Sequence, residues 1–89
     1  MERFPGVEIV REGIEDLRRG ETTVSALLVS IGAPRLREIG LPIPRRVIRS
    51  PEIKLYLHLA QSDPDGAHSK YNALIRRLVS FERAAECAN

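Results

Sequence analysis

Four segments of the chain place hydrophobic residues at the spacing of an α-helix. In the first segment they fall at i, i+3, i+7 and i+10, and charged side chains fill most positions between them. These hydrophobic positions are Val7, Val10, Ile14 and Leu17. The pattern predicts an amphipathic helix, and Gly20 suits the left-handed residue that commonly follows a helix. Gly13 inside the helix costs about 1 kcal/mol relative to alanine, which points to close packing against a neighbour.

The second helical segment should be the most buried one. Ala26 and Val29 broaden its hydrophobic stripe, and either Thr22 or Thr23 offers a hydroxyl that can cap its N-terminus. The stripe itself consists of Val24, Leu27, Leu28 and Ile31. We expect Gly32 to end this helix.

Proline residues divide the middle of the chain. Pro34 suits the first turn of a further short helix over residues 35–39. Residues 41–44 read Leu-Pro-Ile-Pro. Since a proline has no N–H donor and pushes its predecessor towards extended geometry, we expect an extended connector there. Ser50 followed by Pro51 then predicts a helix start with the serine hydroxyl as its cap.

Two helices are expected in the last part of the chain. The first runs from Pro51 to about Gln61 and is hydrophobic on most sides, so we expect it at the centre of the fold or at a dimer interface. A turn over residues 63–66 separates it from a long final helix over residues 67–88. The inward positions of the final helix are Tyr71, Leu74, Ile75, Leu78, Phe81 and Ala85.

These elements predict an all-α fold, a compact bundle of four to five helices with short loops and a proline-rich extended connector near residues 41–44. With 89 residues, the chain is expected to form a single small helical domain over residues 1–89. We expect the helices around Leu27 and Leu57 at the centre and the final helix packed across them. So short a chain builds only a modest core, which dimerisation would enlarge.

The cysteine content and the hydropathy of the chain bear on its cellular compartment. Cys87 is the only cysteine, so an internal disulfide is impossible and nothing indicates a secreted scaffold. The first residues lack the basic and then hydrophobic layout of a signal peptide, and no hydrophobic run approaches the roughly 18 residues of a membrane span. We therefore expect a cytoplasmic protein that does not engage a membrane.

Residues that carry chemistry are few. Neither the phosphate-binding pattern GxxxxGK[ST] nor GxGxxG occurs, and no CxxC or HExxH spacing offers a zinc site. His58, His68 and Cys87 have no local context that marks a base or a nucleophile. We expect no cofactor, no metal and no catalytic residue. An enzyme is the third alternative, and it would need a site assembled between subunits.

Arginine residues provide a lead towards nucleic acid. The net charge is +2, and residues 33–54 hold six basic and two acidic side chains. Arginines beside proline turns can follow a phosphate backbone, and a helix, a turn at Gly32 and a short helix have the coarse layout of a helix-turn-helix unit. The alternative is a solvated surface segment. The candidate nucleic-acid contacts are Arg35, Arg37, Arg45, Arg46, Arg49, Arg76 and Arg77.

The leading hypothesis is a small protein-protein interaction or adaptor module without catalytic activity. It would act as a homodimer or as a subunit of a larger assembly, because the core is limited and one helix is hydrophobic on more than one face. The candidate interface residues are Leu55, Tyr56, Leu59, Tyr71 and Phe81. The alternative is a small nucleic-acid-binding regulator that uses the basic segment at residues 35–49.

Overall fold

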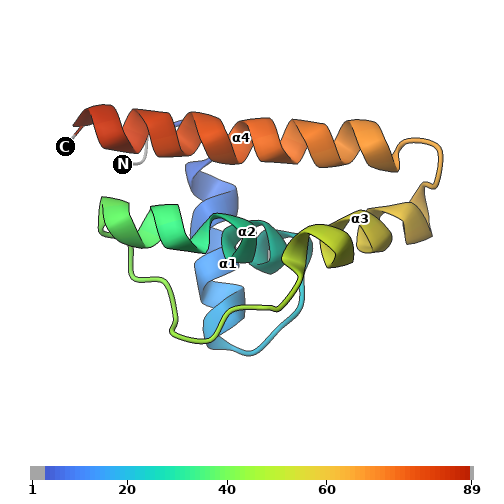
Figure 1. The fold of residues 1–89 in the computed structure, drawn as a ribbon, viewed down its shortest axis with the longest axis horizontal. Helices are drawn as coiled ribbons and strands as arrows, with labels where there is room; N and C mark the ends of the chain where they lie inside the picture. The colour runs from blue at the N-terminus through green and yellow to red at the C-terminus, as the bar shows by residue number, and fades with distance from the viewer. Residues whose placement is uncertain (1–3, 89) are drawn as a thin grey trace.

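The computed structural model describes residues 4–88 and folds them into four α-helices without a β-strand (Figure 1). The helices are α1 (Val7–Arg18), α2 (Val24–Ile39), α3 (Pro51–Ser62) and α4 (Ala67–Ala88). The all-α prediction is therefore confirmed. A Cα radius of gyration of 12.5 Å is close to the value of about 12 Å expected for a compact chain of this length.

Local sequence signals account for the start of α2 and the end of α1. Thr23 Oγ1 accepts a hydrogen bond from the Ala26 N–H at 3.1 Å, as expected of an N-cap. The same hydroxyl donates to Asp16 Oδ2 at 2.6 Å, which ties α1 to the beginning of α2. Gly20 follows α1 with a φ of +74°, the left-handed geometry predicted for it.

The expectation that Gly32 ends the second helix is wrong. α2 continues through Gly32 and Pro34 to Ile39, so the short helix expected over residues 35–39 is the last part of α2. A Cβ atom at Gly32 would lie 3.0 Å from Leu78 Cδ1 and from Glu82 Oε2. The glycine therefore permits close approach of α4, and the packing gained along α2 outweighs the missing N–H donor of Pro34.

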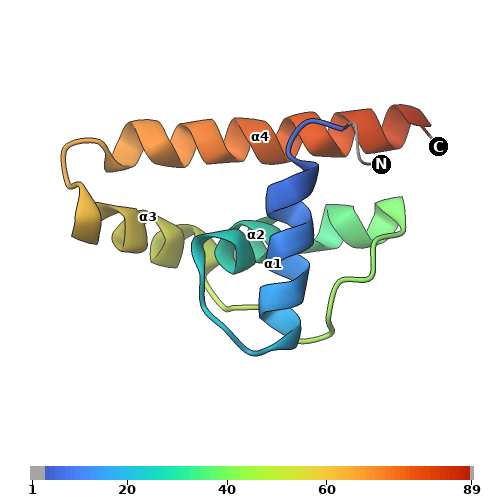
Figure 2. The ribbon, with the colours of Figure 1, turned by 180° about the vertical axis from the view of Figure 1, so that it is seen from behind.

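The core is organised around α2. Nine of the sixteen residues of α2 are buried, and α2 packs against each of the other three helices. Figures 1 and 2 show α4 lying lengthwise along α2 and α3, whereas α1 crosses behind α2 in Figure 1 and in front of it in Figure 2, with its N-terminal end next to α4. The prediction that the helix around Leu27 is central is confirmed. The buried hydrophobic cluster consists of Val7, Val10, Ile14, Leu27, Leu28, Val29, Leu36, Leu55, Leu78, Phe81 and Ala85.

The expectation that the helix around Leu57 is central is wrong. In α3 only Leu55 is buried, whereas 56% of Leu57 and 65% of Ile53 are exposed. α3 packs against α2 and α4 on one side and leaves its other side uncovered. A helix that is hydrophobic all round buries only the face that meets a neighbour, and here the neighbours cover a single face.

The chain between α2 and α3 is irregular, as the prolines predicted. Leu41 and Ile43 are half-buried and pack against the hydrophobic core. Pro51 occupies the first turn of α3 as expected. The cap is different, because the Ser50 side chain makes no capping hydrogen bond and its backbone is left-handed with a φ of 48°.

The Gly13→Ala substitution should destabilise the protein. A Cβ atom at Gly13 would overlap the Ser25 carbonyl oxygen and Val29 Cγ2, where α1 meets α2. Helix propensity alone would stabilise this variant by about 1 kcal/mol, whereas overpacking typically costs about 1–3 kcal/mol. We expect overpacking to win because a backbone atom cannot move aside cheaply. Urea unfolding of both proteins measures the sign, and a more stable variant would show that α1 and α2 are not in close contact at Gly13.

Candidate interaction surface

The irregular segment after α2 is held to the helical core by polar contacts. An Arg37 Nη2 atom on α2 donates to the carbonyl oxygens of Pro44 at 2.7 Å and Arg45 at 3.4 Å. The Ile48 N–H donates to Ser30 Oγ at 3.1 Å, and that hydroxyl donates to the Ala26 carbonyl oxygen at 2.8 Å. These bonds fix the course of the backbone on which the central arginines stand.

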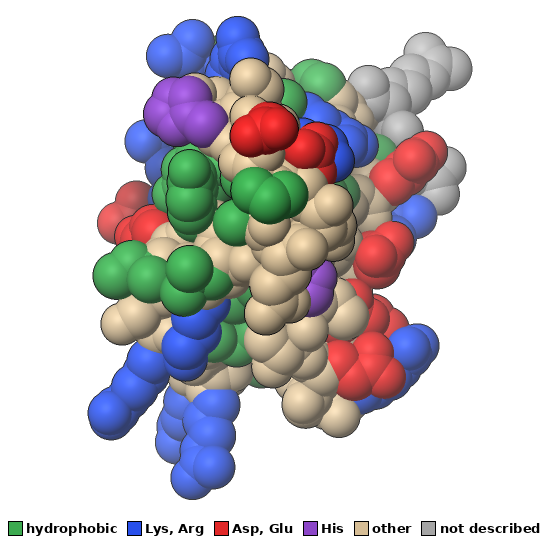
Figure 3. All heavy atoms as spheres, turned by 90° about the vertical axis from the view of Figure 1, so that its right-hand side faces the viewer, with side chains coloured by type: hydrophobic (Ala, Val, Ile, Leu, Met, Phe, Trp, Pro, Cys, Tyr) green, Lys and Arg blue, Asp and Glu red, His purple; other side chains and the backbone are tan. Residues whose placement is uncertain are grey.

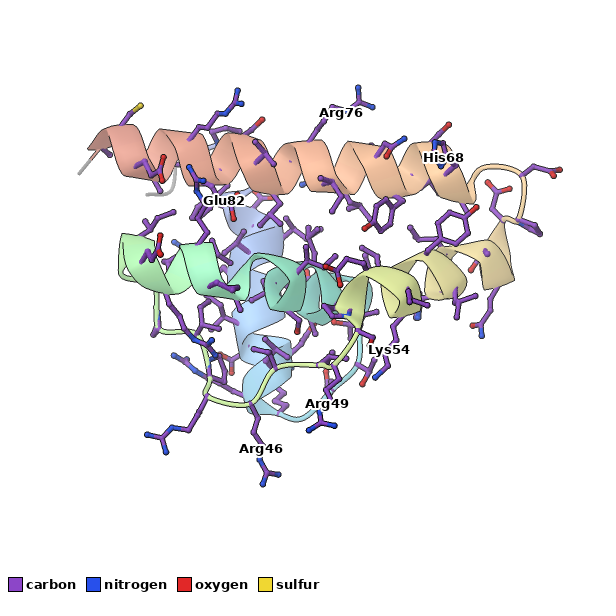
Figure 4. All side chains as sticks on the ribbon, in the orientation of Figure 1. Arg46, Arg49, Lys54, His68, Arg76 and Glu82 are labelled. Atoms are coloured by element: carbon purple, nitrogen blue, oxygen red, sulfur yellow. The ribbon has the colours of Figure 1, made fainter. Side chains whose placement is uncertain are left out.

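Four cations lie on the irregular segment that leads into α3 and on the first turn of that helix. We call them the basic rim, which consists of Arg45, Arg46, Arg49 and Lys54. All four are exposed, and none has an ion-pair partner among residues 4–88. In Figure 4 the side chains of Arg46 and Arg49 point away from the body of the molecule, and Lys54 lies above Arg49 in this view.

The remaining candidate arginines do not join this group. Arg35 forms an ion pair with Glu86 at 2.7 Å, and Arg37 is engaged with the carbonyl oxygens described above. Arg76 and its exposed neighbour Arg77 lie on α4, and Figure 4 shows Arg76 pointing away on the side opposite Arg46. The helix-turn-helix layout is also wrong, because no turn interrupts α2 at Gly32. Three of the seven predicted contacts, Arg45, Arg46 and Arg49, thus lie on one exposed segment, and Lys54 on the first turn of α3 is added to them.

The exposed side of α3 carries a hydrophobic surface. We call it the α3 surface, which consists of Ile53, Tyr56 and Leu57, exposed by 65%, 40% and 56%. The three residues occupy positions i, i+3 and i+4 and therefore share one face of the helix. Tyr56 packs edge-on against the half-buried Tyr71 of α4, with ring centroids 6.2 Å apart.

Five residues were candidates for a protein interface, and the structure separates them. Leu55 and Phe81 are fully buried in the core, so they are withdrawn from any contact surface. Leu59 and Tyr71 are half-buried and pack against the core. Tyr56 alone lies on the exposed face. Sequence reasoning missed Ile53 and Leu57 as surface residues, although their i, i+4 spacing opposite Leu55 and Leu59 was visible.

The α3 surface and the basic rim adjoin one another. Figure 3 views the molecule from the end where α3 turns into α4, and hydrophobic side chains gather there on one side with positively charged side chains projecting below them. Lys54 is one turn from Leu57 on α3, and Arg49 precedes the helix by two residues. The two features form one surface, hydrophobic in the middle and positively charged at the end where α3 begins.

An acidic residue, Asp63, follows the C-terminal end of α3. Asp63 Oδ1 accepts the Gly66 N–H at 3.0 Å, and Asp63 Oδ2 lies 3.2 Å from Lys70 Nζ. The backbone hydrogen bond from Gly66, followed by Lys70, lowers the pKa of this carboxyl. The turn predicted over residues 63–66 is confirmed, and the charge of Asp63 is already satisfied within it.

The side chains considered as possible bases, nucleophiles or metal ligands lie at the surface of the described chain. His58, His68 and Cys87 are each exposed, and within residues 4–88 no group of three or more histidine, cysteine, aspartate or glutamate side chains could hold a metal ion. A pocket of about 320 Å³ lies between the end of α2 and the C-terminal part of α4. It is lined by Phe4, Ile39, Gly40, Leu41, Phe81, Ala85 and Ala88, none of which has a titratable side chain.

Glu82 is a nearly buried carboxylate that sequence reasoning did not single out. It lies between α4 and α2, next to Gly32 (Figure 4), and only 7% of the residue is exposed. Burial raises its pKa, Arg35 opposes this rise, and the charge of Glu86 adds to it. The Glu82 carboxylate thus lies where α2 and α4 are in close contact, and it is not part of the α3 surface.

The Glu82→Gln variant should be more stable than the wild type near neutral pH. The folded protein binds the Glu82 proton more tightly than the unfolded chain, so the free energy of unfolding falls as the pH rises from about 4.5 through the raised pKa. Glutamine has no proton to lose and escapes this fall. Urea unfolding of both proteins at several pH values should show the difference shrinking in acid. A difference independent of pH would show that the burial of a charged carboxylate is not its cause.

Comparison with known proteins gives no family: no family model, no curated protein and no solved structure matches this chain. Among residues 4–88, none of the helices combines the length and hydrophobicity that crossing a membrane requires.

Proposed function

We propose that the protein is a non-catalytic protein-interaction module that contacts its partner through the α3 surface. The observation that carries this proposal is the exposure of three large hydrophobic side chains on one face of one helix. Single exposed hydrophobic residues are ordinary, whereas a contiguous group flanked by charged residues is typical of a protein contact.

The residue types on the α3 surface support the same function. Tyr56 is a large and rigid side chain held in place by Tyr71, and aromatic anchors of this kind supply much of the binding energy at interfaces. Burying Ile53 and Leu57 against a partner would remove hydrophobic area from water at about 25 cal/mol per Å². Lysine and arginine at the edge of such a contact provide steering and specificity.

Photo-crosslinking tests the proposal directly. A benzophenone amino acid is placed at position 57 in one variant and at position 76, where the native side chain points away from the other helices, in the other. In native extract the probe at 57 should give a discrete protein adduct that the Ile53→Glu substitution abolishes, and the probe at 76 should give none. Equal crosslinking at both positions, or none at 57, would contradict the proposal.

The basic rim supports a second candidate function, the binding of nucleic acid. Four neighbouring cations without ion-pair partners in the described chain could contact phosphates. This candidate predicts binding to duplex or single-stranded DNA or RNA that weakens steeply with salt. It also predicts a loss on Arg45→Glu with Arg46→Glu for all sequences alike. We rank it second because Arg35 and Arg37 are engaged within the fold and Arg76 points the other way.

A further inference from the structure

We infer that the partner of the α3 surface is an amphipathic helix of another protein, with acidic residues at the end that lies over the basic rim. This inference rests on the proposed function and names the chemistry of the partner. It follows from the shape of the hydrophobic face and from the charge beside it.

The shape of the α3 surface suits a helix. Its three side chains form a short stripe along the axis of α3, at positions i, i+3 and i+4. Ridges of this spacing pack into the grooves of a second helix that lies along the first. α3 already uses its other side against α2 and α4, so an added helix would extend the same helix-on-helix packing by one member.

The charge beside the stripe calls for an acidic partner. Residues 45–54 carry four basic side chains and one acidic side chain, a net charge of +3. Elsewhere, Arg18 and Arg19 meet Glu15, and Arg35 meets Glu86. The four cations of the rim have no ion pair within residues 4–88, as is also true of Arg76, Arg77 and Arg83 on α4, but the rim lies beside the α3 surface. Carboxylates on the partner would complement this field and guide its approach.

A second copy of the chain fits less well. Antiparallel packing of two α3 helices would place each basic rim against the turn over residues 63–66 of the other copy. Asp63 in that turn is already held by Gly66 and Lys70, so Asp65 would face four cations. Parallel packing would place the two rims together, and like charges in contact are costly. An anionic membrane would meet the exposed carboxylate of Asp65 in the turn beyond α3, and repulsion there would oppose binding of the whole helix face.

Two synthetic helical peptides test the inference. Both carry leucine at i, i+3, i+4 and i+7, but one has glutamate and the other lysine at the flanking positions. Fluorescence anisotropy with the full chain should show saturable binding of the acidic peptide and at least about tenfold weaker binding of the basic peptide. Leu57→Glu should weaken binding of the acidic peptide about tenfold or more. Arg45→Glu with Arg46→Glu should do the same, and raising the salt should reduce that difference.

The matched control is Arg76→Glu with Arg77→Glu, which makes the same change of net charge on α4, where Arg76 points away on the side opposite Arg46, and should leave the affinity unchanged. Circular dichroism of each variant confirms that it is folded. Equal binding of the two peptides, absence of binding, or an equal loss with the double variant Arg76→Glu and Arg77→Glu would overturn the inference. So would concentration-dependent dimerisation that Leu57→Glu abolishes, or preferential binding to duplex DNA or phosphatidylserine vesicles. The proposed function fails separately, if the photo-crosslink at position 57 is absent.

Discussion

The Phe81→Ala variant is expected to lose about 3–5 kcal/mol of stability, the largest effect that we predict for this chain. Phe81 is fully buried and meets the ring of Phe4 edge-on, with centroids 6.2 Å apart. Its loss removes hydrophobic area and leaves a cavity where α4 covers the core. Since small proteins are stable by only about 5–15 kcal/mol, and short chains lie near the lower end, the variant should be partly unfolded at room temperature.

Denaturant titration followed by circular dichroism measures this loss. Phe81→Leu serves as the control, because it keeps most of the volume and should cost less than about 1.5 kcal/mol. If alanine and leucine at this position gave equal stability, Phe81 would not fill the core as described. Phe81 would then again be a candidate for the protein interface, as the sequence predicted.

The Leu55→Ala and Leu57→Ala variants should differ sharply in stability although they are two residues apart. Leu55 is fully buried, so its truncation should cost about 2–5 kcal/mol. Leu57 is 56% exposed, and its truncation should change the stability by about 0.5 kcal/mol or less. The urea midpoints of the two variants give the comparison. Similar losses would mean that α3 buries both faces, and the α3 surface would not exist in the isolated protein.

Local sequence patterns were sufficient to predict a helix where that helix buries a single hydrophobic stripe. The periodicity of residues 7–17 predicted α1, and the long stripe from Tyr71 to Ala85 predicted α4. The threonine pair Thr22 and Thr23 predicted the start of α2, and the Thr23 hydroxyl makes the capping hydrogen bond. In each case the signal lies within a few residues of the feature, which is why sequence alone reveals it.

Local patterns failed at Gly32. A glycine shortly before a proline is typical of a helix end, yet in this fold the glycine lies inside α2. What decides the matter is the approach of Leu78 and Glu82 from α4, nearly fifty residues later in the chain. The same long-range contact buries Glu82, and the residues around Glu82 in the sequence do not predict this burial.

The orientation of α3 could not be derived from its sequence for a related reason. Leu55 and Leu59 on one side and Ile53 and Leu57 on the other are equally hydrophobic, so periodicity does not say which pair faces the core. Only the positions of α2 and α4 decide this. The expected interface therefore stays a prediction, and the exposed hydrophobic residues on which it now rests are Ile53, Tyr56 and Leu57.

The members of the basic rim could not be predicted from the sequence either. Sequence placed the positive excess in residues 33–54, but which arginines share a surface depends on the tertiary fold. Arg37 and Ser30 anchor the backbone on either side of Arg46, whereas Arg35 is drawn to Glu86. The contacts of Arg37 suggest that its role lies in positioning the rim, since its own guanidinium is engaged.

Thiol accessibility measures most directly whether α3 carries the contact surface. In a Cys87→Ser background, the Leu57→Cys and Arg76→Cys variants each have one reactive thiol, since Cys87 is the only native cysteine. Maleimide labelling is timed in the purified protein and in native extract. We expect fast labelling of both thiols in the purified protein and slower labelling at position 57 alone in extract. Slow labelling at position 57 in the pure protein, or equal rates at both positions in extract, would contradict this expectation.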